Sequence, residues 1–324
     1  MKVNFRIESS SFCYVFNKYK IEEIKGTKYI LPEKNATKRT ISVTENIDEL
    51  LIEILNIGKK VFYKEPIEYI ELLNFYSKYG SFGFMIDLAI SKYFIFEDKV
   101  AVRDPFYINN KKNVDFMNVD EYLKFFLPKL NKRDINSLIK KCKDIATDIK
   151  KESYLTSIIN EYLIYNENYA ESVELVLNYA RSLYKTLSYT LDNKNVTMDL
   201  PFLNANHITF NIIELYFNNS FGITINYLKQ AIDIAYSMQM AQDVRLLKVC
   251  NFCNKAFIAN NPKAEYDTPQ CKNKANVYKS RNKSISKNVI QTEKGISVKV
   301  PSKELLDEFV KKLNKQWKVN CYEN

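Results

Sequence analysis

Apolar residues recur at every third or fourth position through much of the chain, which is the spacing of one face of an α-helix. The clearest case is the segment 169–191, where Val176 and Leu187 belong to one apolar stripe and Glu171 and Glu174 fall on the opposite, polar face. Similar patterns predict further helices over residues 46–57, 67–79, 119–127, 134–151, 154–165 and 226–244.

The first 43 residues instead show short apolar runs separated by polar turns, a pattern that predicts β-strands. The predicted strands cover residues 3–7, 12–16 and 28–31, another is expected over 94–102, and residues 210–217 fit either a helix or a strand. Gly58 is expected just past the end of the first helix. The segment 80–83 is expected to be an ordinary turn that places Phe82 in the core.

Charge is distributed unevenly along these elements. The segment 1–243 holds 31 basic and 31 acidic residues and is neutral, whereas the segment 244–288 holds ten basic and two acidic residues. A neutral body with a concentrated basic segment is typical of proteins that bind phosphate groups. A solvated basic helix with no ligand is the alternative interpretation.

The basic segment also contains a cysteine pattern. Cys250 and Cys253 are separated by two residues, and Cys271 follows after seventeen more. Two cysteines at this spacing place both sulfurs on one tight turn, where they can reach a single tetrahedral Zn²⁺. A helix is predicted to start here, with Thr268 as its N-cap, Pro269 at its first position and Cys271 in its first turn. Its basic face holds Lys272, Asn276, Lys279 and Lys283.

The run Cys271-Lys272-Asn273-Lys274-Ala275-Asn276-Val277, with Arg281 beyond it, resembles the closing half of the CGNR zinc-finger family. The resemblance covers about forty residues. It implies a zinc-binding module and, from the descriptions of family members, nucleic-acid binding and transcription regulation. Lys272 and Lys274 stand where the family has Gly and Arg, and Asp267 stands near the position of its fourth cysteine ligand.

Three arrangements of the site follow from these residues. Three thiolates and the Asp267 carboxylate can bind the ion, or three thiolates can bind it with a borrowed ligand or water. The third arrangement holds no metal, and packing on the helix then maintains the module. The packing residues would be Phe252, Phe257, Ile258 and Tyr266.

The elements and motifs together predict a mainly α fold with a small β-containing N-terminal part (α+β). The expected regions are an α+β N-terminal region (1–130), a helical region (131–245), a zinc-finger-like module with a basic helix (246–288), and a hairpin with a C-terminal helix after Ser302 (289–324).

Enzyme activity is not expected. The chain has a single histidine, His207, so most catalytic triads and His-based metal hydrolase sites are excluded. His207 is interpreted as a structural or surface residue, or as a fourth zinc ligand if the fold brings it near. No phosphate-binding GxxxxGK[ST] or GxGxxG loop occurs. A carboxylate-only nuclease site remains an alternative because acidic residues such as Glu65, Glu68 and Glu71 are plentiful.

The chain begins without an apolar leader and contains no long uninterrupted apolar run, so neither a signal peptide nor a membrane span is expected. Cys13, Cys142 and Cys321 lack the spacing of a disulfide framework, and Cys142 is expected to be a small core residue. A reducing cytoplasm is the expected location.

These observations favour a bacterial DNA-binding transcription regulator whose body senses a signal or forms a homodimer. The phosphate-binding residues are expected to be Lys272, Lys274, Lys279, Arg281 and Lys283, and the base-contacting residues Asn273, Asn276 and Arg281. RNA is the less expected nucleic acid. The alternative function is a protein-interaction or phage-defence component in which the zinc-finger-like module is structural.

Overall fold

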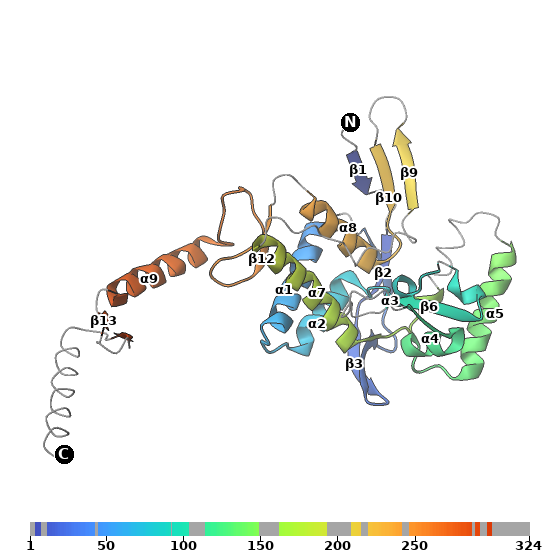
Figure 1. The fold of residues 1–324 in the computed structure, drawn as a ribbon. Coiled ribbons are helices and arrows are strands. Elements are labelled where there is room, and N and C mark those ends of the chain that lie inside the picture. Colours follow the sequence, from blue (N-terminus) through green and yellow to red (C-terminus); the bar gives the residue numbers. More distant parts are fainter. Residues whose placement is uncertain are drawn as a thin grey trace, which may run out of the picture. The chain divides into compact units, whose positions relative to one another are not determined.

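The computed structural model describes residues 4–7, 12–42, 45–91, 93–103, 114–148, 162–192, 209–214, 220–241, 246–286, 289–291 and 297–299. The chain divides into two compact units. One comprises Met1–Val249 and Lys255–Lys263, and the other comprises Cys250–Asn254 and Ala264–Asn324. The predicted fold class is confirmed, because helices predominate and the N-terminal part contains short strands that form small sheets (Figure 1).

Helices are the predominant secondary structure among the described residues of the first unit. They are α1 (Ile47–Phe62), α2 (Tyr69–Tyr79), α3 (Phe84–Leu88), the 3-10 turn η1 (Phe94–Phe96), α4 (Val119–Phe126), α5 (Lys132–Asp148), α7 (Val173–Asp192) and α8 (Leu228–Met240). Helix α1 packs along α7 and also contacts α8. Each of the three contributes fully buried apolar side chains, for example Leu51, Val176 and Ile232. The buried faces confirm the amphipathic patterns in the sequence.

The sheets are small, with two or three strands each. Strand β1 (Asn4–Ile7) pairs parallel with β10 (Ser220–Thr224), which pairs antiparallel with β9 (Thr209–Glu214). The other pairings are antiparallel: β2 (Phe12–Phe16) with β5 (Lys38–Ser42), β3 (Tyr19–Ile24) with β4 (Thr27–Pro32), β4 with β8 (Glu171–Ser172), β6 (Lys99–Arg103) with β7 (Val114–Asn118), and β11 (Leu247–Val249) with β12 (Ala256–Ile258).

Three expectations about these elements were wrong in detail. Gly58 lies inside α1, where α7 passes so close that a Cβ atom would collide with the backbone of Ala180. The segment 94–102 forms the 3-10 turn η1 before its strand begins at Lys99. Helix α7 starts only at Val173, so Glu171 lies in strand β8 and is completely buried.

The expected turn at 80–83 is confirmed, and Glu171 explains its conformation. Its carboxylate accepts hydrogen bonds from the backbone N–H groups of Phe82 (2.9 Å), Gly83 (2.8 Å) and Phe84 (3.1 Å). It also accepts hydrogen bonds from the hydroxyls of Tyr76 (2.6 Å) and Tyr169 (2.7 Å). The buried charge is therefore satisfied by five donors, and the turn is held against β8.

A second buried polar group lies between α3 and α8. The Lys229 ammonium is 2.8 Å from an Asp87 oxygen and 2.6 Å from an Asp233 oxygen, and all three side chains are almost fully buried. The Tyr179 hydroxyl donates to Asp233 at 2.6 Å. Burial raises the pKa of Asp233 to about 7, and Lys229 only partly opposes that rise.

Some expectations fall outside the described residues. These are His207, the helix after Ser302, and most of the segment 154–165. The C-terminal hairpin is present as β13 (Val289–Gln291) and β14 (Ser297–Lys299). Residues 210–217 form strand rather than helix as far as Glu214, and the helix expected over 226–244 is α8, ending at Met240. Cys142 is buried, as expected.

Candidate metal centre

The two N-terminal cysteines of the motif lie on a tight turn, as their spacing predicts. The N–H of Asn254 donates to the carbonyl of Cys250 at 3.0 Å and closes the turn. Asn254 has φ of +59°, a left-handed conformation that asparagine tolerates better than most side chains. The N–H of Asn251 donates to the carbonyl of Glu265 at 3.0 Å, so the turn is hydrogen-bonded to the segment just before Asp267.

The third cysteine is positioned by the start of helix α9 (Pro269–Ser286). The N–H of Cys271 donates to the Thr268 hydroxyl at 3.2 Å, so Thr268 caps the helix as predicted. Pro269 occupies the first helical position, where the absence of an N–H costs nothing. The sequence therefore determines locally where the Cys271 sulfur lies.

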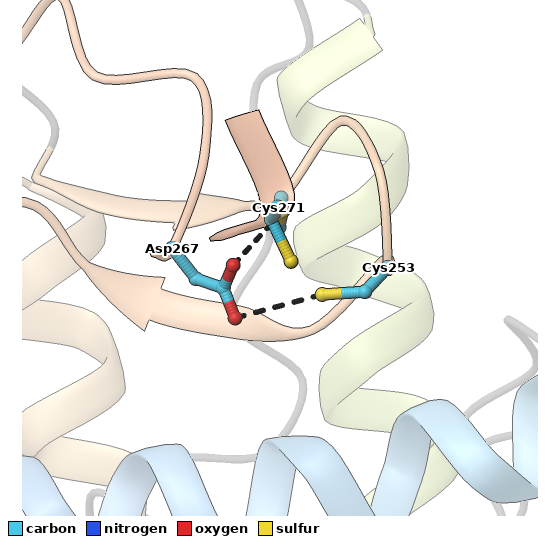
Figure 2. Close-up of side chains that lie close together, drawn as sticks. Cys253, Asp267 and Cys271 are labelled. Carbon is cyan, nitrogen blue, oxygen red and sulfur yellow. Dashed lines mark hydrogen bonds between the residues drawn. The ribbon is translucent and has the colours of Figure 1, made fainter. Parts of the chain in front are cut away.

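These two segments bring four potential ligands together. One ligand atom from each of Cys250, Cys253, Asp267 and Cys271 lies within 4.8 Å of all the others. Asp267 Oδ1 is 3.3 Å from Cys250 Sγ, and Oδ2 is 3.5 Å from Cys253 Sγ. Figure 2 shows the Asp267 carboxylate pointing toward the sulfurs of Cys253 and Cys271. A zinc ion bound at about 2.3 Å separates two tetrahedral sulfur ligands by about 3.8 Å, so the cluster has the size of a metal site.

The protonation of the cluster reflects this proximity. Burial raises the pKa of Asp267, but hydrogen bonds from the thiols of Cys271, Cys250 and Cys253 outweigh it, and the pKa lies below its ordinary value. The hydrogen bond to Asp267 is the main cause that raises the pKa of Cys271. Without a cation, the carboxylate therefore holds the thiol protons that a metal ion would displace.

Apolar packing around the cluster is sparse. Among the described residues of the second unit, Cys250 and Ala275 are the buried ones. Phe252 is half-buried, and its ring centroid lies 5.8 Å from that of Tyr278. Of the four residues expected to hold a metal-free module, Phe257 and Ile258 belong to β12 and so to the first unit, and Tyr266 accepts a hydrogen bond from Lys279 at 3.3 Å. The described part of this unit therefore buries few apolar side chains, as do small domains that depend on a metal or disulfides.

The residues expected to contact nucleic acid all lie on α9. Those whose side chains the structure describes are exposed, namely Lys272, Asn273, Lys274, Asn276, Lys279 and Arg281. Lys283 lies in the same helix, beyond the last described side chain. The helix contains no acidic residue.

Sequence reasoning missed two residues of this module. Asn254 closes the cysteine turn, and its position directly after a C-x2-C pair, where a left-handed residue is needed, was a usable signal. Tyr278 contacts Phe252 across the module, and no local pattern indicated that pairing. Both residues support the geometry of the cluster without contributing a ligand atom.

Comparison of the chain with protein-family models, curated proteins and solved structures gives no match. Within the described part of the chain, no helix has both the length and the apolar character needed to cross a bilayer. The function of the chain is therefore inferred from the cluster and from the basic helix α9, whose first turn contributes Cys271 to the cluster.

Proposed function

We propose that Cys250, Cys253, Asp267 and Cys271 bind Zn²⁺ and that the zinc fixes helix α9 for nucleic-acid binding. The donor set supports zinc because three thiolates favour a borderline-soft cation over Mg²⁺ or Ca²⁺, which prefer oxygen ligands. Four protein ligands complete a tetrahedral shell, as in structural zinc sites.

The zinc has a mechanical role in this proposal. Most of the stability of a helix in a protein comes from packing of an apolar face, and Ala275 is the one buried residue among the described side chains of α9. The helix also carries like charges four residues apart at Lys279 and Lys283. Cys271 is its third residue, so a bound metal anchors the first turn to the cysteine turn. Three thiolates, one carboxylate and Zn²⁺ also carry a net negative charge near the helix N-terminus, where the helix dipole favours it.

The observation that carries the nucleic-acid proposal is the exposed, exclusively basic character of α9. Five Lys or Arg residues occupy this 18-residue helix, and its sequence contains no acidic residue. A polyanion that binds such a helix releases its condensed counterions, and this release favours binding. The excess positive charge of the chain is concentrated around this helix, which supports the same conclusion.

A protein partner with an acidic surface is the second candidate. Val277 is 47% and Tyr278 57% exposed, and such apolar groups on a basic helix suit a protein interface as well. The proposed regulator of transcription and the interaction module differ in one measurable property, because only the former binds free nucleic acid.

The test is fluorescence anisotropy of the zinc-loaded full chain at low salt with a labelled DNA duplex of mixed sequence, about 25 base pairs or two and a half helical turns long. Lys279→Ala/Arg281→Ala is expected to weaken binding about tenfold or more, because two phosphate contacts are lost. Lys34→Ala/Lys124→Ala removes two exposed lysines of the first unit and is expected to leave affinity unchanged. Equal affinity for both variants would contradict the role of α9.

A further inference from the structure

Helix α9 has one inward side. At 3.6 residues per turn, Cys271, Ala275 and Tyr278 lie within about 60° of one another around the helix axis. Cys271 belongs to the metal cluster, Ala275 is buried, and the Tyr278 ring contacts Phe252. This side therefore makes the contacts with the module, although Tyr278 is still 57% exposed, and the other described side chains of α9 after Cys271 are exposed.

The basic residues form two rows on opposite flanks of this helix. Lys272 and Lys279 lie within about 20° of each other, and Lys283 continues their row one turn further on. Lys274 and Arg281 also lie within about 20° of each other, but roughly 180° from the first row. The described members of both rows are exposed. One face alone would suffice for a flat anionic surface, so two opposed rows indicate a ligand that lies on both sides of the helix.

A narrow strip separates the two basic rows on the side away from Cys271. Asn273 and Ser280 lie at its centre, about 90° from each row, with Val277 and Asn276 beside them. All four are exposed. Amide and hydroxyl groups hydrogen-bond to base edges, and an apolar side chain contacts the thymine methyl group. The strip therefore carries the residue types that read DNA sequence.

From this arrangement we infer that α9 lies lengthwise in the major groove of B-form DNA and that its two basic rows contact the two phosphate backbones. The inference rests on the proposed nucleic-acid binding and adds the substrate and the orientation of the helix. An α-helix with its side chains is about 10–12 Å across, and the major groove is about 12 Å wide. The phosphates that border the groove then lie beside the flanks, and the base edges lie below the strip.

Other nucleic acids fit this helix poorly. The major groove of A-form RNA is too narrow for side chains to read. Single strands are bound largely by stacking of bases on aromatic rings, and the one aromatic residue of α9, Tyr278, is 57% exposed but contacts the Phe252 ring on the Cys271 side of the helix, away from the strip. Duplex DNA is therefore the ligand that both the charges and the strip favour.

The first experiment compares ligands by anisotropy, using the zinc-loaded full chain at low salt. A mixed-sequence DNA duplex is expected to bind at least about tenfold tighter than an RNA duplex or a DNA single strand of the same sequence. Bulky substituents at pyrimidine C5, which project into the major groove, are expected to reduce duplex affinity by a similar factor. Equal or tighter binding of RNA or of single strands would overturn the inference while leaving nucleic-acid binding intact. Binding to none of these ligands would refute the proposed function itself.

The second experiment removes one row at a time. Five phosphate contacts predict a log–log slope of affinity against salt of about −4.5, and each pair variant is expected to reduce it to about −2.7. The variants are Lys272→Ala/Lys279→Ala for one row and Lys274→Ala/Arg281→Ala for the other, with Lys34→Ala/Lys124→Ala as the matched control. A normal slope in either row variant would show that only one side of α9 meets phosphates, and the groove orientation would then be wrong.

Discussion

The buried carboxylate of Glu171 provides the sharpest test of how the first unit is held together. In Glu171→Ala the N–H groups of Phe82, Gly83 and Phe84 and the hydroxyls of Tyr76 and Tyr169 lose their acceptor. Each unsatisfied buried donor costs about 1–3 kcal/mol, but relaxation, water entry and relief of the buried charge offset part of that cost. We therefore expect about 3–5 kcal/mol of destabilisation, which is large against a typical total of about 5–15 kcal/mol.

The assay is urea unfolding of the full chain followed by far-UV circular dichroism. Glu174→Ala is the matched control, because Glu174 is an exposed glutamate in the first turn of α7. This substitution is expected to change the free energy of unfolding by less than about 0.5 kcal/mol. Glu171→Gln keeps one acceptor oxygen but turns an NH₂ group toward some of the donors, so it is expected to fall between the two. If Glu171→Ala unfolds within about 1 kcal/mol of the wild type, the five hydrogen bonds do not anchor the turn.

Three further predictions concern other contacts. Because the pKa of Asp233 is raised to about 7, the folded state keeps a proton that the unfolded state releases near pH 4. The wild type should therefore lose stability relative to Asp233→Asn as the pH rises from 4 to 7. Parallel pH profiles of the two proteins in urea unfolding would contradict this. Gly58→Val should lower the melting temperature by several degrees, since its side chain meets the backbone of Ala180, and an unchanged melting temperature in calorimetry would refute that contact. Thr268→Ala should weaken zinc affinity in a chelator competition by a few-fold to about tenfold, because a helix cap is worth about 1 kcal/mol, and Thr268→Ser should restore it.

The parts of the structure that were predictable from sequence depend on local geometry. The C-x2-C turn and the Thr268-Pro269 helix start each need only a few neighbouring residues, and together they placed Cys250, Cys253 and Cys271 near one another. Asp267 directly precedes the Thr268-Pro269 helix start, so the sequence also placed it close to Cys271. Whether it would face the sulfurs depended on the path of the chain from the cysteine turn, which sequence left open.

The errors arose where distant residues decide the local structure. The helical apolar pattern extends upstream of Val173, but four of the five donors that surround Glu171 come from residues 76 to 84, so burial and hydrogen bonding override the periodicity. Gly58 looked like a helix stop because glycine often is one. Its function here is to admit the backbone of α7, a contact that no local pattern reports.

The proposed role of zinc is tested most directly by the metal content of the purified full chain. We predict about one zinc per chain in the wild type and in Cys321→Ser, and a large loss of zinc in Cys250→Ser. Asp267→Ala should retain less zinc than the wild type, because one of the four ligands is removed. A wild-type protein that contains no zinc and takes up none after reduction of its thiols would contradict the account.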